Sequence, residues 1–148
     1  MKISLDESTF WQYACELYIQ PGVKESCLAL QDNQQLNVNL LLLLCWCEQN
    51  QQQLSKSQID ALISAVSPWH QDYTQPLRQL RRQMSQQDAA TSAAKRAMLD
   101  AELALEKIEQ SLLLEMFNRF ELIAVKKADN LTMYCDGADF AVLRQLMP

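Results

Sequence analysis

Apolar residues recur at helical spacing from the start of the chain. Phe10, Ala14 and Leu17 follow one another at intervals of three or four residues, which predicts a helix over residues 8–19. The Pro21–Gly22 pair ends this helix, because proline lacks an amide donor and glycine tolerates the turn.

Two further helices are predicted before residue 50. The first covers residues 23–32, and the second runs over 38–49 with Asn37 as its N-cap. From Leu40 to Cys47 the second of these helices is apolar on every side. A helix without a polar face belongs at the centre of a bundle.

The middle of the chain predicts a polar loop over 50–53 and two more helices. Ser55 or Ser57 caps the fourth helix, and residues 67–69 open a turn before a fifth helix with Pro76 at its first position. The apolar positions of the fourth helix are Ile59, Leu62, Ile63 and Val66. The apolar stripe of the fifth helix is Leu77, Leu80 and Met84.

The sixth helix is predicted over 88–117 and carries small residues at alternating steps of four and three. This alanine stripe consists of Ala90, Ala94, Ala97, Ala101, Ala104, Ile108 and Ser111, and it is flanked by Met98, Leu105 and Leu112. The spacing is that of a heptad seam with alanine in place of leucine. We expect a close antiparallel contact with the fifth helix or with a second copy in a homodimer.

The pattern weakens after Glu121. We expect a loop over 126–130, a short extended piece over 131–135, and a last helix capped by Asp136 or Asp139. The apolar residues of that helix are Phe140, Leu143, Leu146 and Met147. The expected fold is all-α: a single-domain helical bundle of six or seven helices over residues 1–148, with one long alanine-striped helix.

Composition and charge narrow the function classes. The 148 residues include only two glycines, which suits long helices better than sheets with many turns. The formal net charge is -5, and a duplex-binding surface needs a basic excess, so nucleic acid is an unfavoured partner. The first residues lack the basic-then-apolar order of a secretory signal, and residues 38–47 span about half of the ~20 residues that cross a bilayer. We expect a cytoplasmic protein without a membrane segment.

Cysteine and histidine are the residues most often used in metal and nucleophilic sites. Cys45 and Cys47 lie two residues apart, so on a helix their sulfurs point about 200° apart and cannot hold one ion. We expect buried, reduced thiols, with no metal and no cofactor. His70 is the only histidine, and we expect it at a helix entry, solvated or hydrogen-bonded, rather than in catalysis.

The fifth and sixth predicted helices carry charged residues of opposite sign. Glu102, Glu106 and Glu109 share a helix face but lack the Glu-x-x-His pairs of di-iron bundles, so they predict a solvated charged face. Arg78 and Arg82 are one turn apart. Pairing with an acidic helix, through Glu102 or Glu106, is the favoured interpretation, and binding of an anion is the alternative.

Aromatic and polar residues of the first three helices form another candidate site. Asp32 and Asn39 flank the turn before the apolar helix, where we expect them to cap backbone amides or to bond across the turn. The alternative is a binding pocket lined by Trp11, Tyr18, Asp32 and Asn39.

The chain resembles an uncharacterised family of small proteobacterial proteins. The residues on which the resemblance rests form the pattern FW-x-YA, Y-x-x-PGV-x-x-x-CL-x-LQD and NVNLLL between Phe10 and Leu42, followed by Trp69 and PLRQLRR at 76–82. It extends to about residue 110 and departs at Gln35, where the family tends to have glycine. The resemblance implies a compact helical, cytoplasmic bacterial protein and no known activity.

No motif in the sequence specifies a reaction. A nucleophile elbow, a phosphate-binding loop and a metal-ligand cluster are all lacking. We therefore expect a non-enzymatic protein-interaction module, an adaptor or scaffold, whose docking surface is the alanine stripe. The alternative is a small-ligand binding protein or an enzyme with a pocket between helices.

Overall fold

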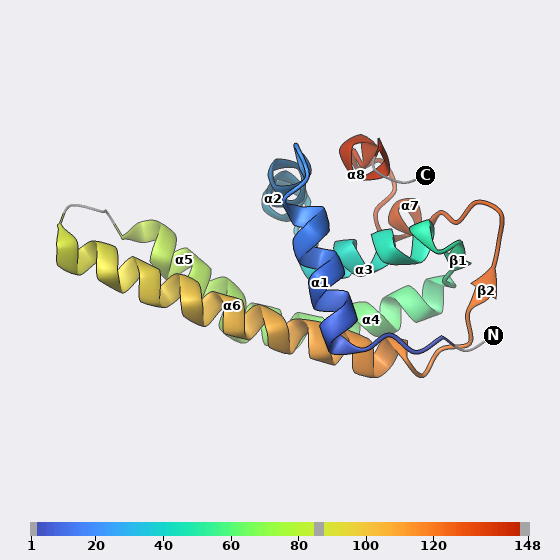
Figure 1. Ribbon diagram of the computed structural model, residues 1–148, viewed down its shortest axis with the longest axis horizontal. Coiled ribbons are helices and arrows are strands. Elements are labelled where there is room, and N and C mark those ends of the chain that lie inside the picture. The colour runs from blue at the N-terminus through green and yellow to red at the C-terminus, as the bar shows by residue number, and fades with distance from the viewer. Residues whose placement is uncertain (1–2, 85–87, 146–148) are drawn as a thin grey trace.

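The computed structural model describes residues 3–84 and 88–145, and nearly all of its regular structure is helical (Figure 1). The helices are α1 (Glu7–Tyr18), α2 (Val23–Gln34), α3 (Val38–Gln49), α4 (Lys56–Trp69), α5 (Gln75–Gln83), α6 (Ala89–Phe117), α7 (Asn130–Tyr134) and α8 (Ala141–Gln145). The predicted all-α class is confirmed. Part of the predicted loop over 50–53 is instead a strand, β1 (Gln52–Gln53), which pairs antiparallel with β2 (Ile123–Ala124).

Helix α3 lies at the centre of the core, as its apolar pattern predicts. Its residues from Leu40 to Cys45 are buried, and α1, α2, α6 and α7 pack around it. The Asn37 side chain accepts the Leu40 amide at 2.9 Å, which confirms the predicted N-cap. Cys45 and Cys47 are buried thiols, as expected, and burial raises the pKa of each so that both stay protonated.

The turn predicted over 67–69 is wrong, because α4 and α5 form one continuous rod. Helix α4 runs through Pro68 and is followed by a π-helical segment, His70–Thr74, which leads directly into α5. Proline lacks an amide donor and its ring crowds the preceding turn. A wider π turn between Pro68 and Pro76 lets the rod continue past both prolines.

Helices α5 and α6 form an antiparallel hairpin whose far end projects from the rest of the molecule (Figure 1). The alanine stripe does not make this contact: Ala97, Ala101 and Ala104 are exposed. Leu80, part of the predicted apolar stripe of α5, is also exposed, whereas Arg78 is buried. The two helices meet through charged side chains, which the hydrophobic pattern does not reveal. No helix in the two described ranges is long and apolar enough to span a membrane.

The C-terminal segment packs back onto α3 and α2. Residues 130–134 form α7 instead of the predicted extended piece, because the buried Glu48 carboxylate accepts the amides of Asn130 at 2.9 Å and Leu131 at 2.7 Å. A carboxylate at a helix N-terminus stabilises the first turn. The predicted last helix corresponds to α8, while Leu146 and Met147 lie outside the described residues.

Gln35 ends α2 with φ 60° and ψ 30°, the left-handed conformation that glycine adopts without strain. Replacing it with glycine, Gln35→Gly, should therefore raise the free energy of unfolding by about 1 kcal/mol. The matched control, Gln34→Gly, places glycine inside the last helical turn and should lower it by about 1 kcal/mol. Urea denaturation measures both values, and equal destabilisation by the two variants would contradict this account of the turn.

Candidate functional site

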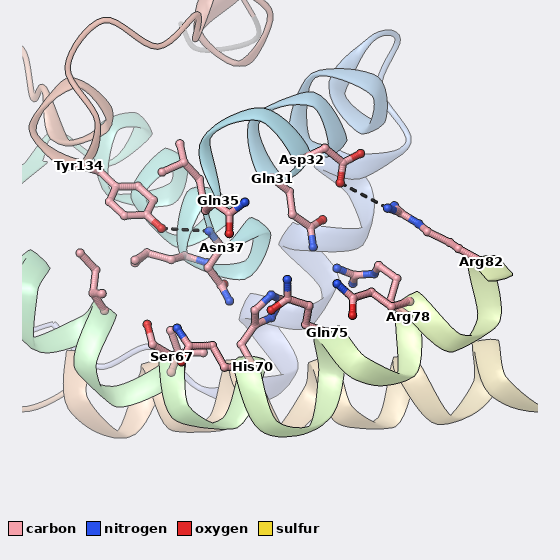
Figure 2. Close-up of a pocket in the computed structure, with 16 residues that line it drawn as sticks. Gln31, Asp32, Gln35, Asn37, Ser67, His70, Gln75, Arg78, Arg82 and Tyr134 are labelled. Carbon is pink, nitrogen blue, oxygen red and sulfur yellow. Dashed lines mark hydrogen bonds and ion pairs between the residues drawn. The ribbon is translucent and has the colours of Figure 1, made fainter.

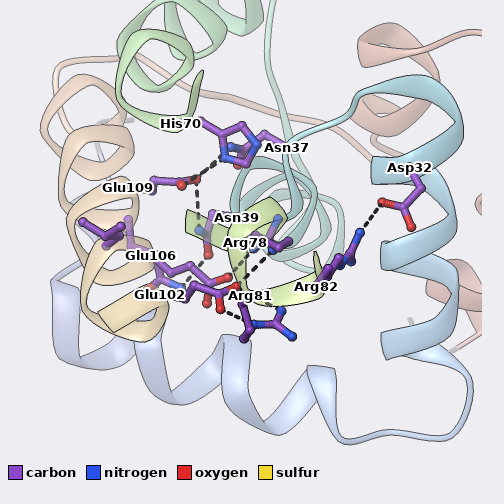
Figure 3. A network of polar contacts seen from close by, with 12 residues as sticks. Asp32, Asn37, Asn39, His70, Arg78, Arg81, Arg82, Glu102, Glu106 and Glu109 are labelled. Carbon is purple, nitrogen blue, oxygen red and sulfur yellow. Dashed lines mark hydrogen bonds and ion pairs between the residues drawn. The ribbon is translucent and has the colours of Figure 1, made fainter. Parts of the chain in front are cut away.

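The glutamates of α6 face the interior, not water. Glu102 is 4% exposed and Glu109 is 1% exposed, while Glu106 is partly buried. The predicted solvated face is therefore wrong. The prediction failed because the α4–α5 rod supplies positively charged and hydrogen-bonding partners along the length of this face (Figure 3).

Arginines of α5 pair with two of these carboxylates. Arg78 donates from Nη2 to Oε1 of Glu106 at 2.8 Å, and its Nε lies 3.4 Å from Oε1 of Glu102. Arg81 donates to both oxygens of Glu102. The predicted pairing of Arg78 is confirmed, whereas Arg82 turns the other way and lies 3.3 Å from Asp32 on α2.

The third carboxylate, Glu109, joins α6 to the rod and to the start of α3. Its Oε2 lies 3.1 Å from Nδ1 of His70. Its Oε1 accepts hydrogen bonds from the side-chain amides of Asn37, at 2.8 Å, and Asn39, at 3.4 Å. Burial acts to raise the pKa of Glu109, but the hydrogen bonds from His70 and Asn37 oppose it, and the pKa lies below its ordinary value.

These contacts correct three sequence assignments. His70 is hydrogen-bonded, as expected, but it lies inside the continuous rod rather than at a helix entry. Asn39 does not satisfy backbone amides: it bonds to Glu109 and accepts from Gln110 at 3.0 Å. Asp32 pairs with Arg82 instead of capping the turn.

A polar cavity of about 370 Å³ lies between the α2–α3 turn and the rod. Its lining includes Asp32, His70, Arg78, Arg82 and amide side chains from both walls (Figure 2). These amides include Gln31 on α2, Gln35 at the C-cap of α2, and Gln71, Gln75 and Gln79 on the rod. Sequence reasoning missed these glutamines, although their spacing of four residues places each set on one helix face.

A second, apolar cavity of about 250 Å³ lies between α1, α2, α3 and α6. Trp11, Tyr18 and Asn39, three of the four residues of the predicted pocket, line it together. The fourth, Asp32, lines the polar cavity instead. The structure thus divides the six candidate binding residues between two neighbouring cavities, and Arg78 lines both.

Gln31 and Arg78 form the wall that the two cavities share. Arg78 is 9% exposed, yet its Nη1 has no hydrogen-bond partner among the described residues. The same is true of Oε1 of Gln31. A buried polar atom without a partner is costly, so this shared wall contains one donor and one acceptor whose hydrogen-bonding capacity is unused.

Within residues 3–84 and 88–145, no three His, Cys, Asp or Glu residues are grouped so as to hold a metal. The cavity wall does contain a π-helical turn at His70, and such turns are frequent at functional sites.

Replacing Glu109 with glutamine should lower the free energy of unfolding at pH 7 by about 2 kcal/mol, because its donors lose a charged acceptor. The low pKa of Glu109 means that its stabilisation is present above its ordinary value of 4.5 and is lost as the pH falls below it. The stability gap between wild type and Glu109→Gln should therefore shrink below pH 4.5 in thermal melts.

Glu106→Gln is the matched control for that pH dependence. Burial, opposed by Arg78, raises the pKa of Glu106, so ionisation of this carboxyl weakens the fold as the pH rises. The stability gap between wild type and Glu106→Gln should therefore grow in favour of the wild type as the pH falls, whereas the gap for Glu109→Gln shrinks. The same pH trend in both variants would contradict the assigned roles of the two carboxylates.

Comparison with known proteins gives a family but no activity. Residues 9–113 match the family described as "Protein of unknown function (DUF2390)". No curated protein and no solved structure matches the chain. The match spans more than two thirds of the chain and contains most of α1, all of α2 to α5 and most of α6. The proteobacterial origin expected from the sequence pattern stays a prediction. The chain therefore belongs to this family of proteins of unknown function.

Proposed function

We propose that this protein binds a small polar molecule with an acidic group in the polar cavity. The observation that supports the proposal most directly is Arg78, a buried guanidinium in the cavity wall with one nitrogen left without a partner. Guanidinium groups recognise carboxylates and phosphates through their fork of donors.

Two cations and one carboxylate belong to the lining of the polar cavity. Arg78 and Arg82 line the polar cavity, and Asp32 is the acidic residue of its lining. Glu102 and Glu106 balance the charge of Arg78 from behind, outside this lining. The amides and the Tyr134 hydroxyl supply further donors and acceptors for the rest of a polar ligand.

The network holds the binding groups in place before a ligand arrives. Arg78 is fixed by two carboxylates of α6, and His70 is fixed by Glu109. Nδ1 of His70 makes the contact with Glu109, so Nε2 is the ring nitrogen left for a ligand. A side chain that is already fixed loses little conformational entropy on binding, which strengthens affinity.

Opposite changes at the Asp32–Arg82 pair should change affinity in opposite directions. Arg82→Gln removes a cation from the lining, so binding of acetate and inorganic phosphate should weaken about tenfold, the equivalent of ~1.4 kcal/mol. Asp32→Asn frees Arg82 from its competing carboxylate and should strengthen binding by a similar factor. Chemical-shift titrations measured by NMR give these affinities.

Arg119→Gln is the control, because Arg119 is exposed and pairs with Glu115 away from the cavity. It should leave both titrations unchanged. The proposal fails if neither anion shifts the resonances of cavity residues, or if Arg82→Gln and Arg119→Gln behave alike.

The exposed alanine stripe favours a second candidate, in keeping with the interaction role expected from the sequence. We propose that a second copy docks there in antiparallel orientation. Centred between Ala101 and Ala104, such a pair sets Ala97 against the bulky Ile108 of the other copy. It also brings Asp100 near the second copy's Lys107, so the charges are complementary.

The non-enzymatic character and the cytoplasmic location remain predictions.

Ala97→Glu should abolish this dimer, because it places a carboxylate in the seam. Ala89→Glu, on the same helix but outside the alanine stripe, is the matched control and should leave the dimer intact. Light scattering coupled to size-exclusion chromatography over a range of concentrations gives the masses. A monomeric wild type, or a dimer insensitive to Ala97→Glu, would exclude this surface.

A further inference from the structure

We infer that the polar and apolar cavities are two halves of one binding site, separated by Gln31, and that its ligand is an amphipathic carboxylic acid with an apolar tail. This inference rests on the proposed function, since it assigns the acidic group to the polar cavity. It adds the part of the ligand that the polar cavity does not explain.

The shared wall is the first reason. Both cavities are lined by Gln31 and Arg78, which extend toward one another from α2 and from α5 (Figure 2). Oε1 of Gln31 and Nη1 of Arg78 have no partners among the described residues, so no hydrogen bond joins the two side chains across the wall. Gln31 is a flexible side chain that can rotate without breaking a hydrogen bond of its Oε1.

The apolar cavity is the second reason. Trp11, Leu28, Val38 and Leu42 line it, together with the aromatic ring of Tyr18. A concave surface of apolar and aromatic side chains, with a few polar groups at one end, is the usual form of a small-molecule site. The polar end here is the one that borders Arg78.

The distribution of charge fixes the orientation of the ligand. Glu106 lines the apolar cavity, and it would repel a carboxylate placed there. Arg82 and His70 line only the polar cavity. The acidic head group therefore lies beside Arg78 on the polar side, and the tail extends past Gln31 toward Trp11.

Isothermal titration calorimetry with octanoate, acetate and octan-1-ol tests the two halves separately. Each methylene buried should strengthen binding roughly fourfold, so octanoate should bind at least 100-fold more tightly than acetate, with one site per chain. Octan-1-ol has the tail without the acid and should bind at least tenfold more weakly than octanoate.

A matched pair of substitutions places the tail. Leu28→Trp fills the apolar cavity and should weaken octanoate binding at least tenfold while leaving acetate binding unchanged. Leu80→Trp is the control, because Leu80 is half exposed on α5 and lines neither cavity. Thermal melts of both variants verify that they fold.

The failures of this inference and of the proposed function are distinguishable. If octanoate and acetate bind equally, or if Leu28→Trp leaves octanoate binding unchanged, the joined site is wrong and the polar-cavity proposal stands. If octanoate binds 100-fold more tightly than acetate but no more tightly than octan-1-ol, the assignment of an acidic head group to the ligand is wrong. If acetate, phosphate and octanoate all fail to bind, the proposed function itself is wrong.

Discussion

The structure depends on the need to pair carboxylates that α6 buries. An unpaired charge in the interior costs several kcal/mol, so Glu102, Glu106 and Glu109 require partners within reach. Arg78 and Arg81 supply them from α5, and His70 supplies one from the π-helical turn. These contacts fix the rod along α6, and the amides of Asn37 and Asn39 fix the start of α3 against the same helix.

The same constraint produces the cavities. A face held by ion pairs and amides does not fill space as apolar side chains do, and the α2–α3 turn lies over it without closing it. Most polar groups of this face already have a fixed partner. Arg78 is an exception, because two of its nitrogens meet carboxylates and the third has no partner in the described chain.

Sequence patterns predicted those elements in which one physical signal dominates. The central helix α3 with its apolar run over 40–47, its Asn37 cap and the bounds of α6 follow from periodicity and capping, and the structure has them where they were expected. The continuous rod was missed because Pro68, taken from the sequence alone, predicts the end of a helix. The π turn that lets the helix continue past Pro68 packs against α6, a contact that the local sequence does not reveal. Helix α7 was missed because its cap is Glu48, 82 residues away in sequence.

The candidate site was predicted only in part, for a related reason. Trp11, Tyr18 and Asn39 share a cavity as the sequence suggested, but the buried state of Glu102 and Glu109 depends on partners from another helix. A charged residue is assigned to solvent by default when its partner is unknown. Opposed runs of arginine on α5 and glutamate on α6 were the available signal, and pairing them in antiparallel register would have indicated the network.

Native mass spectrometry of the wild-type protein mixed with octanoate tests the central claim most directly. The account predicts one octanoate per chain, retained under gentle conditions, released on denaturation, and retained less by Arg82→Gln than by Arg119→Gln. Bare chains at saturating octanoate, or several molecules bound per chain without regard to Arg82, would contradict it.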